Sequence, residues 1–357
     1  EDEYEGYEKD SVKPDPKSSE GPKITFAQLP AHLRSNWESY YLELVILSGL
    51  VLYFINFFIG RTKNQKIADA WFQTFQSVLQ DNFAMVGDDG KLENSQPGIL
   101  KESENVYLLW CSGRTACEAV LFELRLVKRQ DLVSLVMSLF RPQVDQVHVK
   151  VFMNESDMDS FVLCLASKKS ATRLAREMAD ISVYCPDKKS AGEKFSLPPN
   201  KFFLMSEIGE AATALLDHRV CHVVNENPDF VESIHFSDQY SGPKQPEETT
   251  PSKMPDVKKM LIFTFNLRTL PGMGIEKSLE KMKPAISIVF YCMERVKRFR
   301  LSKEAKAKAE KNRQKVEEAF LKSTHAARAE AAAARREEKR RLEKEKILQE
   351  DDPEKQR

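Results

Sequence analysis

The chain has 357 residues, with 54 lysines and arginines balancing 54 aspartates and glutamates. This balance excludes a chain that is cationic throughout, so any affinity for a polyanion must come from a local surplus of positive charge. Acidic, apolar and basic residues instead occupy successive parts of the sequence.

The N-terminal residues 1–36 are predicted to form an acidic luminal tail and juxtamembrane segment. Residues 1–20 carry eight aspartates or glutamates against three lysines, and such a segment cannot bury enough apolar surface to order itself. Loose acidic tails bind Ca²⁺ weakly, but no Dx[DN]xDG loop is present, which favours a solvating tail without a bound ion. Because the sequence begins with Glu1 rather than Met, we expect upstream sequence that includes a cleaved signal peptide.

One stretch is long and apolar enough to cross a bilayer. Residues 40–60 provide the roughly 20 residues that a helix needs to span a hydrocarbon core of about 30 Å. Trp37, Tyr40 and Tyr41 lie at its N-terminal end, and Arg61, Lys63 and Lys66 follow it, as at membrane boundaries. We therefore predict one transmembrane helix with its flanks at residues 37–62, since these flanks disfavour a buried core helix.

The basic residues also predict the orientation of this span. More of them follow the span closely than precede it, so we expect the N-terminus in the lumen and the C-terminal part in the cytosol. All six cysteines follow the span, where a reducing compartment would keep them as thiols. The sequon at Asn154 should then stay bare, and sugar on it would contradict the orientation.

One face of the span is predicted to contact a partner helix. It consists of Ser48, Gly49, Leu52 and Asn56. Residues spaced by four share a helix face, and small or polar residues there let a second transmembrane helix approach and hydrogen-bond. For Ser48 and Asn56, hydrogen bonds to their own helix are an equal alternative.

Residues 63–283 are predicted to form a cytosolic α+β domain, so the fold class of the whole chain is α+β with a single-pass transmembrane helix and a long basic helical extension. Apolar residues at four-residue steps predict an amphipathic helix at 66–86. Strands are predicted at 106–111, 119–127, 146–153, 161–166 and 260–267, helices at 130–140 and 170–184, partly helical structure at 202–216, a turn at 87–91 and a mobile loop at 241–257.

This domain contains no motif of a familiar catalytic centre. GxSxG, HExxH, Walker A and a complete GxGxxG are absent, so an enzyme is not expected. The tight cluster of metal-capable side chains, HRVCH at residues 218–222, lacks a fourth ligand at a recognisable spacing. A structural histidine pair at a helix end is favoured, and Asp217 next to His218 is not a catalytic pair because adjacent helical residues do not face each other.

Residues 284–349 have the composition of a long helix. After Pro284 the segment contains neither Gly nor Pro and is dominated by Ala, Glu, Lys and Arg, the strongest helix formers. If continuous, the helix would be on the order of 100 Å long, with the apolar residues 286–293 buried. A heptad seam through Val316 is too polar to pair, so the segment resembles a coiled coil in composition only. Residues 350–357 are expected to be a disordered tail.

The same segment carries a local surplus of positive charge. Residues 295–349 have nineteen lysines and arginines against nine glutamates, which favours a large polyanion, either anionic lipid or ribosomal RNA. RNA is favoured because lipid binding needs a broad apolar face that is lacking here, and a solvated helix without a partner is the remaining alternative. The candidate RNA-binding residues are Arg295, Lys297, Arg298, Arg300, Lys303, Lys306, Lys308, Lys311, Arg313, Lys315, Arg335, Arg336, Arg340 and Arg341.

Three runs are distinctive: YYLELVILSGLVLYFINFFIG, ADAWFQTFQSVLQDNFAMVG and RLSKEAKAKAEKNRQKVEEAF. They resemble the calumin family of endoplasmic reticulum proteins, also called coiled-coil domain-containing protein forty-seven, over nearly the whole chain. The resemblance implies a PAT complex subunit that acts with Asterix as an intramembrane chaperone in the multipass translocon, at the ribosome-bound Sec translocon of the rough endoplasmic reticulum. It also implies that the basic C-terminal helices contact ribosomal RNA. The family's long acidic luminal region, associated with weak Ca²⁺ binding, is mostly absent from this sequence.

The sequence therefore leaves two hypotheses about the function of the chain, and they belong to different classes. The first is a non-enzymatic assembly factor that links the ribosome and Sec translocon to the insertion of nascent multipass membrane proteins. The second is a calcium-binding membrane protein of calcium homeostasis whose basic tail binds anionic lipid.

Overall fold

The computed structural model describes residues 40–87, 98–198, 200–244, 254–269 and 272–349. Two compact units are distinguished, Glu1–Leu52 and Tyr53–Arg357. The predicted acidic tail, the C-terminal tail, nearly all of the turn at 87–91 and most of the loop at 241–257 lie outside the described residues, as does the calcium alternative that depends on the tail.

The predicted span and the amphipathic helix after it form one continuous helix, α2 (Tyr41–Asn82), rather than two. Among the described residues, α2 alone is long and apolar enough to cross a membrane, and no residue of its apolar window is buried. Beyond Gly60 the character of the helix changes, because Ile67, Trp71, Phe75 and Leu79 are buried in the core. The four-residue spacing of these side chains places them on one face of the helix.

The core of the second unit is built on an antiparallel sheet of ten strands, all of them within the described residues. The strands are β1 (Met85–Val86), β2 (Leu100–Lys101), β3 (Val106–Ser112), β4 (Cys117–Arg125), β5 (Asp145–Met153), β6 (Val162–Ser167), β7 (Lys189–Ser190), β8 (Phe202–Ser206), β9 (Val231–Tyr240) and β10 (Lys258–Leu267). Their order is β1-β3-β4-β5-β10-β9-β6-β8-β7, with β2 paired to β3. The five predicted strands are confirmed as β3, β4, β5, β6 and β10.

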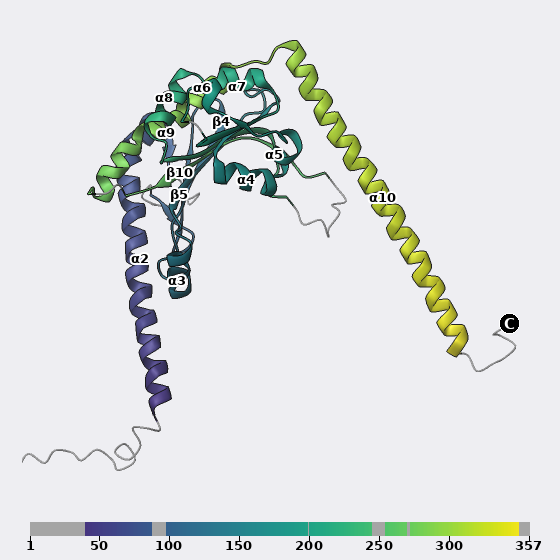
Figure 1. The fold of residues 1–357 in the computed structure, drawn as a ribbon, viewed down its shortest axis with the longest axis horizontal. Helices are drawn as coiled ribbons and strands as arrows, with labels where there is room; N and C mark the ends of the chain where they lie inside the picture. Colours follow the sequence, from purple (N-terminus) through teal and green to yellow (C-terminus); the bar gives the residue numbers. More distant parts are fainter. Residues whose placement is uncertain (1–39, 88–97, 199, 245–253, 270–271, 350–357) are drawn as a thin grey trace, which may run out of the picture. The chain divides into compact units, whose positions relative to one another are not determined.

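Helices cover both faces of the sheet (Figure 1). On one face, α2 shares a core with α7 (Gly209–Leu215), α8 (His218–Glu226) and α9 (Ile275–Arg298). On the other, α4 (Lys168–Glu177) and α5 (Ala179–Tyr184) pack on β6 and β8. Alternate residues of β6 belong to the two cores, as the period-2 geometry of a strand requires. The helix predicted at 170–184 is thus present but broken at Met178.

Two short helices lie in connections. The helix predicted at 130–140 is confirmed as α3 (Leu132–Phe140), which is capped by the Asp131 side chain. A single turn, α6 (Gly192–Phe195), precedes β8. The segment 202–216 is only partly helical, because β8 precedes α7.

The C-terminal segment is two helices, which answers the question of continuity that the sequence left open. The first, α9, begins at Ile275 and includes Pro284, and α10 spans Lys303–Gln349. A tertiary contact and a local cap lie at the break. The Leu301 N–H donates to Asp159 at 2.8 Å, and the Ser302 hydroxyl accepts from the Ala305 N–H at 3.3 Å. The latter bond begins a new helix, since serine is a preferred N-cap. The apolar turns at 286–293 are largely buried, as predicted.

Replacing Trp71 by alanine tests the role of α2 in the core. Its indole is fully buried, with ring centroids 5.1 Å from Phe75 and 5.7 Å from Phe122. We expect Trp71→Ala to lower the free energy of unfolding by about 3–5 kcal/mol, since it leaves a large cavity. Denaturant unfolding in detergent, followed by circular dichroism, measures this. Trp110→Ala is the control, because Trp110 is 38% exposed and should cost much less; equal losses would contradict the packing described.

Candidate functional site

The predicted partner face of α2 continues into a contact within the chain. Ser48 donates to the Val45 carbonyl of its own helix at 2.8 Å, and a Cβ on Gly49 would meet open space. Leu52 is exposed. Asn56, by contrast, donates through Nδ2 to the carbonyl of Arg129, 3.2 Å away in the connection between β4 and α3. Of the four residues of this face, Asn56 therefore contacts a loop of the same chain.

The next two steps of the series, Gly60 and Asn64, contact the same connection, here named the 127–130 loop. A Cβ at residue 60 would lie 2.4 Å from the Arg129 carbonyl carbon and oxygen, so the close approach requires glycine. The Asn64 side chain donates to the Val127 carbonyl at 3.1 Å and accepts from Arg129 Nη1 at 2.8 Å. Arg129 also forms a two-point ion pair with Asp145 at 2.6 and 2.9 Å.

Sequence reasoning missed this network, although a signal existed. Continuing the four-residue series of Ser48, Leu52 and Asn56 by two steps reaches Gly60 and Asn64. Both fall on the same side of the helix as Asn56, and Asn64 is fully buried.

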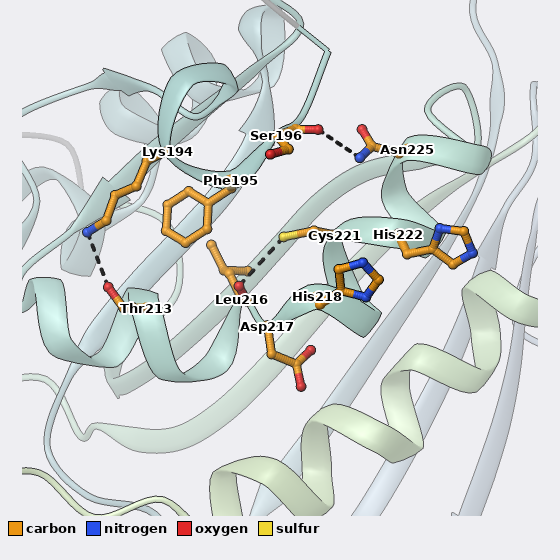
Figure 2. A pocket seen from close by; sticks show the side chains of 10 residues that line it. All are labelled: Lys194, Phe195, Ser196, Thr213, Leu216, Asp217, His218, Cys221, His222 and Asn225. Carbon is orange, nitrogen blue, oxygen red and sulfur yellow. Dashed lines mark hydrogen bonds between the residues drawn. The ribbon is translucent and has the colours of Figure 1, made fainter.

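The HRVCH cluster lines a cavity of about 460 Å³ (Figure 2). His218 and His222 lie on one face of α8, with ring centroids 6.0 Å apart and planes 11° from parallel. Cys221 points elsewhere, since its thiol donates to the Leu216 carbonyl at 3.6 Å. Burial raises the pKa of the Cys221 thiol to about 11, so the thiol is protonated at neutral pH and is a poor nucleophile.

The polar residues around this cavity have structural partners. Asp217 caps α8 by accepting from the Val220 N–H, and it also accepts a hydrogen bond from the Tyr291 hydroxyl of α9. The histidine pair therefore stands at a helix end, as predicted. Within the part of the chain that the structure describes, no three His, Cys, Asp or Glu side chains are placed to hold a metal ion.

The candidate RNA-binding residues divide into two groups, of which the first lies near the domain. Arg295 donates to the Ala214 carbonyl at 2.8 Å, and Lys306 pairs with Asp159 at 3.2 Å. Arg300 donates to the Lys297 and Phe299 carbonyls, and Arg298 pairs with Glu294 at 3.9 Å. Lys297 is half-buried, while Lys303, Lys308, Lys311 and Lys315 are exposed.

Arg313 differs from all the others because its charge is neutralised inside the protein. Its guanidinium contacts Asp238 at 2.5 and 2.9 Å and Glu207 at 3.1 Å, and it lies over the Tyr184 ring at 5.3 Å. Burial alone would lower the pKa of Arg313, but the two carboxylates outweigh it and raise that pKa. Both carboxylate side chains are nearly inaccessible, so this cluster docks α10 on the domain.

The second group lies in the distal half of α10. Arg335, Arg336, Arg340 and Arg341 are all exposed, as are nearly all residues between 325 and 346. Four guanidinium groups are thus presented to solvent on one rigid helix, an arrangement suited to phosphate oxygens.

Known proteins resemble this chain over most of its length. A family model described as PAT complex subunit CCDC47 matches residues 39–357. The PAT complex subunit CCDC47 of Homo sapiens is 47% identical over 336 residues, covering 92% of this chain and 68% of that protein. That of Danio rerio is 45% identical over 361 residues, covering 100% and 72%. An uncharacterized protein of Arabidopsis thaliana is 32% identical, covering 78% and 55%. None of these relatives is named as an enzyme.

Replacing Arg313 by methionine tests the docking of α10. The change leaves the buried carboxylates of Glu207 and Asp238 without their cation, so we expect a loss of about 3–5 kcal/mol in the free energy of unfolding. We also expect trypsin to cleave the first turns of α10 faster. The measurements are denaturant unfolding and timed proteolysis.

Two further variants control this experiment. Arg336→Met on the exposed part of α10 should change stability little. Adding Asp238→Asn to Arg313→Met should recover part of the loss, because one buried charge is removed. If Arg313→Met and Arg336→Met behaved alike, the described cluster would not hold α10.

Proposed function

Because the chain belongs to the family of the PAT complex subunit CCDC47, we propose that it is a non-catalytic subunit of an endoplasmic reticulum membrane assembly. In this proposal the apolar part of α2 is the single membrane anchor. The N-terminus faces the lumen and the α+β domain faces the cytosol. The basic residues that follow the span and the six buried, unbridged cysteines beyond it support that orientation.

We further propose that α10 links this assembly to the ribosome by binding ribosomal RNA. The exposed cluster of Arg335, Arg336, Arg340 and Arg341 carries this proposal. The first turns of α10 are held on the domain by Arg313, so the distal cations project on a helix whose base is fixed. Structured RNA is recognised largely through phosphates and shape, which a rigid cationic helix can follow.

Anionic lipid is less well matched to the distal part of α10. An interfacial helix needs a wide apolar face opposite its basic one. Leu321 and Leu342 are exposed large apolar side chains on α10, about half accessible each, and they are separated by six helical turns. The charged residues surround the helix rather than forming one face.

The other proposed partners meet the chain in or near the membrane. The relatives are named as subunits of a PAT complex, and we propose that this chain likewise assembles with Asterix, other multipass translocon subunits and the Sec translocon. Ser48, Gly49 and Leu52 offer a face for a partner's transmembrane helix, since small residues permit close approach. Nascent multipass proteins are the proposed clients.

Neutralising the four distal arginines tests RNA binding. We expect the Arg335→Ala, Arg336→Ala, Arg340→Ala and Arg341→Ala combination to weaken co-sedimentation with ribosomes from solubilised membranes. The slope of log affinity against log salt should become shallower by roughly 0.7–0.9 for each phosphate that the variant no longer neutralises. Alanine preserves the helix, so weaker binding reports charge.

The matched control replaces Glu330, Glu337, Glu338 and Glu343 by alanine on the same part of α10. This variant should bind ribosomes more tightly, because it removes negative charge from the same surface. Unchanged binding in both variants would refute the RNA assignment. If the arginine variant lost binding to anionic vesicles but kept its binding to ribosomes, the lipid alternative would be favoured instead.

A further inference from the structure

The helix α3 is apolar over most of its surface, with Ser134 and Ser138 on one side, and yet it is not part of the core. Its nine residues, LVSLVMSLF, include seven large apolar side chains, and none of them is buried. Leu139 and Phe140 are each 78% exposed, and Val133 is 70% exposed. An exposed apolar surface of this extent normally marks a contact with a membrane or with another protein. Water is therefore an unsuitable surrounding for this surface.

The polar groups of α3 are satisfied locally. The Asp131 carboxylate caps the helix by accepting from the N–H groups of Val133 and Ser134 at 3.1 and 3.3 Å. The Ser134 hydroxyl donates to the same carboxylate at 2.7 Å, and the Ser138 hydroxyl donates to the Leu135 carbonyl at 2.6 Å. Both serines can thus enter an apolar medium without losing a hydrogen bond, which removes the main cost of leaving water.

The position of α3 follows from the 127–130 loop that precedes it. That loop contacts α2 at Gly60, the last residue of the apolar run, and is hydrogen-bonded to Asn56, about one turn earlier. A cavity of about 400 Å³ lies between α2 and α3, lined by Ile59 and Lys63 on one side and Leu135 and Ser138 on the other. The exposed surface of α3 therefore adjoins the exposed apolar side chains of α2 that directly precede Gly60.

Basic residues surround this apolar surface. Arg141 is exposed and follows α3 directly, Lys128 precedes it, and Lys63 lines the cavity from α2. Lysine and arginine beside an apolar helix match the negative charge of lipid headgroups, while their long stems reach back along the hydrocarbon. A partner protein's apolar groove would have no general need for this border of positive charge.

We propose that α3 inserts into the leaflet at the C-terminal end of the span and is covered by lipid acyl chains. At about 1.5 Å per residue it is roughly 14 Å long, enough to enter one leaflet but not to cross a core of about 30 Å. It is a second membrane contact, which prevents the domain from turning about α2. The inference requires α2 to cross the membrane, which the proposed function also requires.

Site-specific fluorescence on the full chain tests this inference. The environment-sensitive dye NBD is attached to Leu139→Cys, and the chain is reconstituted in vesicles of phosphatidylcholine with a minority of phosphatidylserine. The six native thiols are buried, so the unsubstituted chain provides the labelling background. Ile55→Cys in the span and Leu342→Cys on distal α10 are the lipid and water controls.

We expect NBD at residue 139 to emit at shorter wavelength than at residue 342. We also expect several-fold stronger quenching by a nitroxide on the acyl chain than by a water-soluble quencher. An aqueous signal at residue 139 with a lipid signal at residue 55 overturns the inference while leaving the anchor intact. An aqueous signal at both positions overturns the anchor and the proposed function as well. A short-wavelength signal that neither quencher reduces means that protein covers α3, which also overturns the inference.

Discussion

The contact between the backbone of the 127–130 loop and α2 at Gly60 is the constraint on which the rest of the structure depends. Any larger residue would place a Cβ within 2.4 Å of the Arg129 carbonyl group. Asn56 and Asn64 fasten the same loop one turn before and one turn after Gly60, and Arg129 joins it to Asp145 at the start of β5. This contact places the sheet and α3 next to the point where the apolar run of α2 ends.

Positive charge is used in two different ways beyond the domain. The Arg313 guanidinium is largely shielded from water and pairs with two buried carboxylates, and this pairing holds α10 in place on the domain. Removing the cation or a carboxylate would leave an unpaired buried charge. The Arg335 and Arg341 side chains are exposed to solvent. A polyanion could therefore bind them without displacing a buried carboxylate. The same residue type therefore anchors the base of α10 and leaves its distal half available.

Local patterns predicted the span, the strands from β3 to β6, β10 and the helix at α3, because periodicity and a capping residue identify such elements without tertiary information. The break before Lys303 could not be predicted, because it involves Asp159, more than 140 residues away from Leu301 in the sequence. The ion pairs of Arg313 with Glu207 and Asp238 could not be predicted either, because these residues are also far apart in the sequence. The exposure of α3 could not be predicted from the sequence either, since an apolar run has the same pattern whether it packs in a protein core or in a bilayer.

Hydrogen–deuterium exchange on the full chain in lipid nanodiscs tests the central contact most directly, with the unsubstituted chain compared with Gly60→Leu. We predict that amides of residues 127–140 are protected in the unsubstituted chain and exchange much faster in the variant, because leucine forces the loop off α2. The central strands β9 and β10 should keep their protection and show that the domain is still folded. Equal protection of residues 127–140 in both chains would contradict the central role of this contact.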